Sequence, residues 1–154
     1  MTRLSPNFTL EQMIKSDDHY PPSYREIANL TALTHHVLEF IWKRFNLKAD
    51  DLLSAYRSVA HNAAIGGAKG SRHLTGDAAD IRADDALQIE IAAYATTIEV
   101  LLPSGRTVYP VGGFGIYPGR KGLVHVDQRP RLADGRATTW AQIDGKYESL
   151  TPAM

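Results

Sequence analysis

Hydrophobic residues recur at helical spacing in the first third of the chain. Thr9-Leu10-Glu11-Gln12 has the form of a capping box, which predicts a short helix from about Leu10. Ser16-Asp17-Asp18 and Pro21-Pro22 are expected to end it, and a second capping box over 23–26 predicts a long helix toward Phe45. Apolar positions follow one another every three or four residues along that helix, so one of its faces is expected to pack into the core. They are Ile27, Leu30, Leu33, Val37, Leu38, Ile41 and Trp42.

Short apolar runs alternate with turn residues in the rest of the chain. We expect a strand over 52–56, a loop over 57–70 with a helical turn near 60–65, and a buried strand over 78–81. A helix capped by Asp84 or Asp85 is expected to run to about Leu102, followed by a turn at Ser104-Gly105. Two strands over 113–117 and 122–127 are expected to be joined by a hairpin connection at 118–121, followed by a polar tail over 136–147 anchored by Trp140 and Tyr147. Helices come first and strands mostly later. This order predicts a single α+β domain over residues 1–154, with a small, mainly antiparallel sheet and helices packed around it.

Composition narrows the classes of function. The chain has 154 residues, the usual size of one domain, and its 17 basic residues balance its 17 acidic ones. A neutral chain gives no electrostatic reason to expect nucleic acid or an anionic membrane surface as a partner. The absence of cysteine excludes thiolate metal sites, so a metal would need His, Asp or Glu. We see neither a secretory signal nor an apolar run long enough to insert into a membrane, and we expect a monomer.

The densest group of potential metal ligands lies between Ser71 and Asp80. His73 and Asp80 are separated by Gly76, a residue that permits a sharp chain reversal and can bring an imidazole and a carboxylate onto one metal. His125 is the best third ligand, because period-2 alternation places it on one strand face with Asp127. Spacing alone leaves two other interpretations open. The first pair could be an ordinary hydrogen-bonded turn, and His125 could be a core histidine bonded to Asp127.

One segment resembles a known motif. Ser71-x-His73-x-x-Gly76-x-Ala78-x-Asp80 is similar to the Ser-x-His-x-x-Gly-x-Ala-x-Asp motif of the zinc D-Ala-D-Ala carboxypeptidase family, which also includes phage L-alanyl-D-glutamate endopeptidases and is structurally akin to the hedgehog signalling domain. Further resemblances to the family, over about residues 7–140, are Asn7-Phe8-Thr9-Leu10, Ser54-Ala55-Tyr56-Arg57-Ser58, the loop with Asn62, Gly66 and Gly67, and the closing strands with Gly115-Ile116-Tyr117 and Val124-His125-Val126-Asp127.

The resemblance implies a set of roles. His73, Asp80 and His125 would hold Zn²⁺, which activates water for attack on an amide. Arg57 would stabilise negative charge on the scissile carbonyl oxygen, and Ser71 would support the site or hold substrate. Tyr117 is expected to line the peptide cleft, together with Trp140, although aromatic packing in the core is an equal alternative for both.

The sequence departs from part of the family at Gly122. Many members have an acidic residue at that position, three residues before the last histidine ligand, and glycine can do no acid–base chemistry. The nearest carboxylate on the strand is Asp127. It could act as the general base, or it could instead orient a ligand imidazole. His61 and Asp77 are weaker candidates for the base.

The expected function is hydrolysis of peptidoglycan stem peptides, by a D,D-carboxypeptidase or an L-alanyl-D-glutamate endopeptidase, with a phage or prophage lysin favoured by the missing signal. The alternatives are a zinc-retaining module that binds peptides without cutting them, and a hydrolase of a different amide. Arg129 and Arg131 are expected either to contact substrate carboxylates or to be surface charge. We expect His35-His36 to be boundary positions on the long helix and His19 to be solvated.

Overall fold

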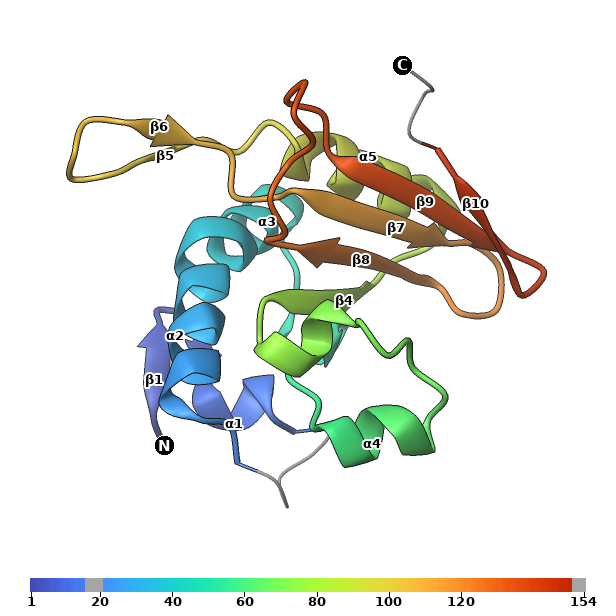
Figure 1. Cartoon of the computed structure of the whole chain (residues 1–154), viewed down its shortest axis with the longest axis horizontal. Helices are drawn as coiled ribbons and strands as arrows, with labels where there is room; N and C mark the ends of the chain where they lie inside the picture. Colours follow the sequence, from blue (N-terminus) through green and yellow to red (C-terminus); the bar gives the residue numbers. More distant parts are fainter. Residues whose placement is uncertain (16–20, 151–154) are drawn as a thin grey trace.

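A six-stranded sheet forms the centre of the molecule (Figure 1). The computed structural model describes residues 1–15 and 21–150, so the predicted break at Ser16-Asp17-Asp18 and the solvation of His19 lie outside the described residues. From one edge to the other, the strands are β10 (Lys146–Ser149), β9 (Thr138–Ile143), β7 (Gly113–Tyr117), β8 (Leu123–Asp127), β4 (Ala78–Arg82) and β3 (Leu52–Ser54). Only the pairing of β7 with β9 is parallel within this sheet; the other pairs are antiparallel. The predicted α+β class with a mainly antiparallel sheet is therefore confirmed.

The two predicted helix starts near the N-terminus are confirmed. A small ladder of β1 (Arg3–Ser5) and β2 (Phe8–Thr9) leads into α1 (Leu10–Met13), where Thr9 and Gln12 form the full capping box. The Ser23 hydroxyl accepts a hydrogen bond from the Glu26 backbone N–H at the start of the long helix. That helix consists of α2 (Tyr24–Leu33), a π-helical segment η1 (Thr34–Leu38) and α3 (Glu39–Phe45).

The apolar stripe of the long helix packs into the core as predicted. Leu30, Leu33, Val37, Leu38 and Ile41 are fully buried. His35 lies at the boundary of this core, where its Nε2 atom is 2.7 Å from the Leu4 carbonyl oxygen. Within residues 1–15 and 21–150, no helix combines the length and the apolar character needed to cross a membrane.

The helix that follows β4 is shorter than predicted. Asp84 caps α5 (Asp85–Ala95) by accepting a hydrogen bond from the Leu87 N–H, but the helix ends at Ala95 instead of continuing to about Leu102. The hydroxyls of Thr96 and Thr97 bond back to carbonyl oxygens three residues earlier, and residues of this kind disfavour further helix. The next residues form a protruding hairpin, β5 (Val100–Leu101) and β6 (Thr107–Val108), around the predicted turn at 104–105 (Figure 1).

The C-terminal segment was expected to be a polar tail anchored by Trp140 and Tyr147. Trp140 does pack against His125, but the segment is a pair of strands and not a tail. Residues 138–149 form the β9–β10 hairpin, which adds two strands to the sheet. Its turn is Asp144-Gly145, with both residues at positive φ (52° and 77°), as a two-residue type I′ connection requires. Tyr147 is 65% exposed and so is not a buried anchor.

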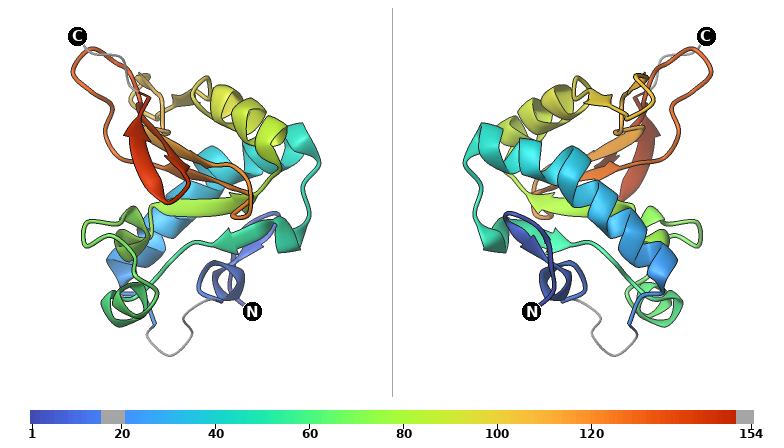
Figure 2. Two further views of the ribbon diagram at one scale, coloured as in Figure 1. Left: turned by 90° about the vertical axis from the view of Figure 1, so that its right-hand side faces the viewer. Right: turned by 90° about the vertical axis from the view of Figure 1, so that its left-hand side faces the viewer.

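The central strands place apolar and polar side chains on opposite faces. Ile81 on β4 and Val124 and Val126 on β8 are fully buried in the core, together with residues of the long helix and α5. α5 packs on β7 and β8 and also contacts α3, so the helices cover this face, as the side views in Figure 2 show. The alternating positions on β4 and β8, among them Asp80 and His125, point away from the helices.

Candidate metal centre

A single row of residues crosses the sheet from edge to edge on the face without the long helix. The strand registers pair each member with the next: Ser54, Asp80, His125, Gly115, Trp140 and Ser149. Because directly opposed side chains on one sheet face are about 5 Å apart, this register alone brings the Asp80 carboxylate beside the His125 imidazole. The remaining member of the predicted ligand set, His73, comes from outside the sheet.

His73 is delivered by a 3-10 turn, η3 (Arg72–Thr75), just before β4. The Ser71 hydroxyl accepts a hydrogen bond from the His73 N–H and starts the turn. Gly76 ends it with φ = 77°; a Cβ atom there would lie 2.7 Å from the Glu26 carbonyl oxygen, so the close approach to α2 requires glycine. These two residues of the motif therefore have a structural role in placing the imidazole.

The buried His73 ring presents its Nε2 atom to Asp80. Its Nδ1 atom lies 2.6 Å from the Ala55 carbonyl oxygen and must donate to it, because a carbonyl can only accept. A proton is therefore on Nδ1, which leaves Nε2 as the ring atom that can bind a metal. Among the described residues, His73 Nε2 is the buried side-chain atom that has no hydrogen-bond partner, although Asp80 Oδ1 is 3.2 Å away.

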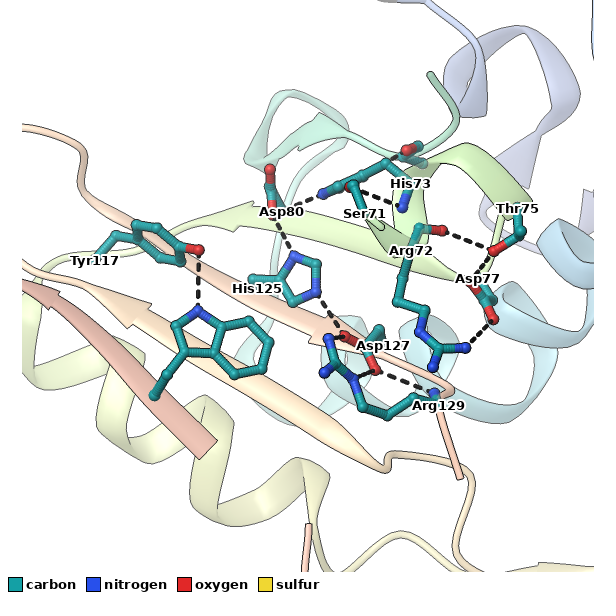
Figure 3. Close-up of polar contacts among 12 residues, drawn as sticks. Ser71, Arg72, His73, Thr75, Asp77, Asp80, Tyr117, His125, Asp127 and Arg129 are labelled. Atoms are coloured by element: carbon teal, nitrogen blue, oxygen red, sulfur yellow. Dashed lines mark hydrogen bonds and ion pairs between the residues drawn. The ribbon is translucent and has the colours of Figure 1, made fainter. Parts of the chain in front are cut away.

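His125 presents its Nδ1 atom to the same carboxylate oxygen. Nε2 of His125 lies 2.8 Å from Asp127 Oδ2, and Nδ1 lies 3.0 Å from Asp80 Oδ1 (Figure 3). Burial opposes a charge on this ring, but the hydrogen bonds and charges of Asp127 and Asp80 outweigh it and raise the pKa of His125 to about 9. Burial also opposes charge on Asp80, yet both histidines hold the pKa of its carboxyl well below the usual range.

Three ligand atoms thus converge from His73, Asp80 and His125, all within 4.8 Å of one another and all on buried residues. A carboxylate facing two imidazole nitrogens is stable only if a cation or protons lie between them. Two imidazoles and one carboxylate with an open side toward a cleft are a donor set typical of a catalytic metal site. The group could therefore hold a metal ion, and His73 Nε2 is the atom that a metal would satisfy.

Arg57 fixes the outer oxygen of Asp80. Its guanidinium donates to Asp80 Oδ2 at 3.1 Å, to Asn62 Oδ1 at 3.1 Å and to Ser54 Oγ at 3.3 Å. Gly67 makes room for this arrangement, because a Cβ atom at that position would lie 2.0 Å from Asn62 Oδ1. Asn62 lies on α4 (Val59–Ala64), close to the predicted helical turn. Arg57 thus leaves Oδ1 of Asp80 turned toward the histidines.

Asp127 is held by Arg129 from the other side. The Arg129 Nε atom and its backbone N–H donate to Asp127 Oδ1 at 2.8 and 3.1 Å, and NH2 donates to Oδ2 at 2.7 Å. Burial disfavours a charged Asp127, but His125 and Arg129 hold the pKa of its carboxyl well below the usual range. The Arg129 side chain lies over Gly113, where a Cβ atom would be 2.5 Å from Nε.

Trp140 occupies the space above the glycine beside His125. A Cβ atom at Gly115 would lie 2.2 Å from the Trp140 Nε1 atom. The indole centroid is 5.3 Å from that of the His125 ring, and the Arg129 guanidinium carbon is 4.9 Å from the indole centroid. The Trp140 Nε1–H donates to the Tyr117 hydroxyl oxygen at 3.0 Å (Figure 3). An aromatic residue from β9 is therefore built into the site.

A cleft of about 770 Å³ opens above these residues. One wall comes from the segment before β4 and consists of Ile65, Gly66, Gly67, Ala68, Gly70, Ser71, Arg72 and His73. The opposite wall comes from β9 and β10 and consists of Thr138, Thr139, Trp140, Tyr147, Glu148 and Ser149. The region between the two walls is lined by Arg57, Asp80, Tyr117, Lys121, Leu123, His125 and Arg129. Four of these residues are cations, and two, Asp80 and Glu148, are acids. Such a cleft favours a substrate that carries negative charge.

The structure brings together every residue that the sequence singled out for the site: Arg57, Ser71, His73, Asp80, Tyr117, His125 and Asp127. The weaker candidate Asp77 instead accepts from the Thr75 hydroxyl at 2.6 Å. Arg131 binds the carbonyl oxygens of Val111, Thr96 and Gly135, which is a structural role. The sequence did not indicate the arrangement of Arg129 and Trp140; the glycines at 113 and 115 were the available signal.

Comparison with known proteins identifies the family. The model of the peptidase M15 family matches residues 6–127, which include all three candidate ligands and most of the sheet. None of the curated proteins compared with the chain is a significant match. The family match agrees with the resemblance carried by the motif between Ser71 and Asp80. The chain therefore belongs to the peptidase M15 family, as the motif predicted.

Proposed function

We propose that this protein is a zinc-dependent hydrolase of peptidoglycan stem peptides, acting as a D,D-carboxypeptidase or an L-alanyl-D-glutamate endopeptidase. The observation that carries the proposal is the convergence of His73 Nε2, Asp80 Oδ1 and His125 Nδ1 at the base of an open cleft in a peptidase-family chain. We further propose that it acts at the bacterial cell wall, as a phage-encoded or otherwise released enzyme.

Zinc is the proposed metal because two imidazoles and one carboxylate suit its borderline-soft character. Such a metal lowers the pKa of a water molecule toward about 7 and polarises a peptide carbonyl. The chain contributes a fixed donor set: Ala55 holds the His73 tautomer, Arg57 holds Asp80, and Asp127 holds the Nε2–H of His125. Each ligand therefore has a partner that orients it, which is the usual arrangement behind catalytic metals.

Arg57 has a second proposed role toward the substrate. Its guanidinium lines the cleft beside Asp80, so a donor that remains after its three hydrogen bonds can face the oxygen of a scissile carbonyl. A positioned cation there stabilises the negative charge that develops as the amide is attacked. Ser71, which lines the same wall, is proposed to support substrate in addition to starting the His73 turn.

Asp127 is proposed to orient His125 and not to act as the general base. It is fully buried, and hydrogen bonds from His125 and Arg129 occupy both of its carboxylate oxygens. A base must be within reach of the water whose proton it takes, and its pKa must be near the working pH. Asp127 meets neither condition, because both of its oxygens are engaged and its pKa is lowered. The same contacts suit a carboxylate that orients an imidazole ligand.

These contacts also favour the second candidate, a zinc-retaining module that binds peptides without cutting them. Gly122 has no carboxylate, and Asp127 is engaged on both oxygens, so the proposed ligand set lacks an evident base beside it. The two candidates share the metal site and the cleft and differ only in turnover.

Digestion of purified peptidoglycan and of a synthetic stem peptide separates the two. The zinc-loaded chain is expected to release fragments whose masses identify one cleaved bond, and His125→Ala is expected to abolish the release. His36→Ala is the matched control, since His36 lies on the long helix outside the cleft lining. Binding of the stem peptide without any cleavage would instead establish the binding module.

A further inference from the structure

Resting on the proposed peptide substrate, we propose that Tyr117, held by Trp140 and flanked by Lys121, binds a carboxylate group of that substrate. We call these three residues the carboxylate corner. It lies on the side of the cleft formed by the β7–β8 connection and the β9–β10 hairpin, across from the wall that contains Ser71. The corner would select anionic peptides over their amidated forms.

The direction of the Tyr117 hydroxyl follows from its partner. The indole N–H of Trp140 can only donate, so the Tyr117 oxygen accepts at 3.0 Å, and its own proton must point elsewhere. Trp140 itself is fixed above Gly115 and packs beside the Arg129 guanidinium and the His125 ring. Figure 3 shows the Tyr117 hydroxyl on the side that faces Asp80 and His125. The phenol is thus a pre-positioned donor beside the candidate metal centre.

The phenol remains a donor throughout the ordinary pH range. Burial, opposed in part by the Trp140 hydrogen bond, raises the pKa of Tyr117 to about 12, and a hydrogen bond with Tyr147 and the charge of Asp80 act in the same direction. The neutral hydroxyl can exchange its hydrogen bond with Tyr147 for one to a substrate carboxylate, because hydrogen bonds to charged groups are the stronger ones.

Lys121 supplies the positive charge of the corner. Its ammonium nitrogen is 5.8 Å from the centroid of the Tyr117 ring. The three other cations of the cleft are paired: Arg57 with Asp80, Arg129 with Asp127 and Arg72 with Asp77. Lys121 is exposed and pairs with none of the carboxylates in the part of the chain that the structure describes. It is therefore available to a substrate anion.

The corner depends on a segment beyond the family match. The matched region ends at residue 127, whereas Trp140 lies on β9 and Tyr147, whose ring centroid is 6.4 Å from that of Tyr117, lies on β10. The metal ligands all lie within the match. Tyr117 and Lys121 also lie within the match, so carboxylate selection would combine residues of the matched region with the hairpin that follows it.

Binding can be tested without turnover through the indole N–H resonance of Trp140, assigned in the ¹⁵N-labelled, zinc-loaded chain by its loss in Trp140→Phe. We expect a saturable shift with an uncleavable stem-peptide analogue that has reduced amide bonds and free carboxyl groups, and binding about tenfold weaker when the carboxyl groups are amidated. Tyr117→Phe, followed through backbone amides as well, and Lys121→Gln should each largely remove this preference. Tyr109→Phe, which removes the hydroxyl that donates to Glu99 at 2.6 Å, is the matched control.

Steady-state kinetics on the cleavable stem peptide, in its carboxylate and amidated forms, provides a second readout. Tyr117→Phe and Lys121→Gln should raise KM for the carboxylate peptide about tenfold with little change in kcat, and should leave the amidated peptide unaffected. Carboxylate-selective binding without hydrolysis would contradict the proposed hydrolase and support the corner. Equal affinity for the two peptides, or a preference that persists in both variants, would overturn the corner even if the chain cuts peptidoglycan.

Discussion

Nε2 of His125 and Oδ2 of Asp127 lie 2.8 Å apart, on two residues of one strand that point to the same face of the sheet. This contact fixes the proton of His125 on Nε2 and turns Nδ1 toward Asp80. It also occupies one oxygen of Asp127, while Arg129 binds both. Of the two roles that the sequence left open for Asp127, the geometry favours orientation of the imidazole.

Substitution of Asp127 by asparagine separates these two roles. An amide at this position accepts hydrogen bonds less strongly and pairs poorly with Arg129, so we expect zinc affinity to fall by about 10–100-fold. Activity at saturating zinc should recover to within about tenfold of the wild type. Zinc affinity is measured by competition with a chromogenic chelator, and Asp134→Asn, at an exposed aspartate paired with Arg136, is the control. Unchanged zinc affinity with a loss of kcat above about 10³-fold would instead assign Asp127 as the base.

Gly115→Ala tests the packing of Trp140. The new Cβ atom would lie 2.2 Å from the indole Nε1, so the indole must move away from both His125 and Tyr117. Overpacking of this kind costs about 1–3 kcal/mol, which urea unfolding can measure. Gly70→Ala should be close to neutral, because a Cβ atom there has no neighbour within 4 Å and Gly70 is not at positive φ. Equal stability of the two variants would contradict the described position of Trp140.

Arg57→Lys retains the charge but not the three-way contact with Ser54, Asn62 and Asp80. A lysine ammonium is a point donor and cannot reproduce the planar fork, so Asp80 loses its orientation and the scissile carbonyl loses a donor. We expect kcat/KM for the stem peptide to fall by about 10²–10³-fold. Arg106→Lys, at an exposed arginine of the β5–β6 hairpin, should have no effect. An Arg57→Lys enzyme of wild-type activity would show that the guanidinium has no role toward the scissile carbonyl.

Stability should depend on pH in opposite directions with and without metal. In the metal-free chain, the pKa of His125 is about 9 against an ordinary value of 6.5, so its contribution is fully present below pH 6.5 and lost as the pH rises through about 9. The pKa of Asp127 is lowered, so its contribution is present above its ordinary value of 3.8 and lost as the pH falls further. A metal requires deprotonated imidazoles, so zinc-loaded protein should gain stability over the same rise.

Thermal unfolding at pH 6.5 and pH 9, with chelator and with zinc, measures this difference. The unfolding temperature should fall with pH in chelator, and the stabilisation by zinc should grow. A parallel change in both conditions would show that protons and zinc do not compete for His125.

Local sequence signals predicted much of the fold. The two capping boxes placed α1 and the long helix, and period-2 alternation placed His125 and Asp127 on one face of β8, opposite Val124 and Val126. These patterns report contacts between residues close in the sequence, which is why they succeed. The prediction that the helix continues to about Leu102 was wrong, because the Thr96 and Thr97 hydroxyls compete for backbone carbonyls at its end.

Contacts between distant strands were harder to predict. The parallel pairing of β7 with β9 places Trp140 opposite Gly115, and no pattern within either segment specifies that register. The hairpin signal Asp144-Gly145 was present in the tail, but a polar composition around it favoured a loop. Likewise, Arg129 folds onto Asp127 because Gly113 leaves space for its side chain. Gly113 lies on β7 and Asp127 on β8, so this contact also depends on the pairing of two strands.

Metal content and peptidoglycan hydrolysis, measured on one preparation made without chelator, test the central claim most directly. We expect about one zinc per chain, its loss in His73→Ala, and release of stem-peptide fragments by the wild-type chain alone. A folded wild-type chain that takes up no metal would contradict the site formed by His73, Asp80 and His125, and with it the proposed hydrolase.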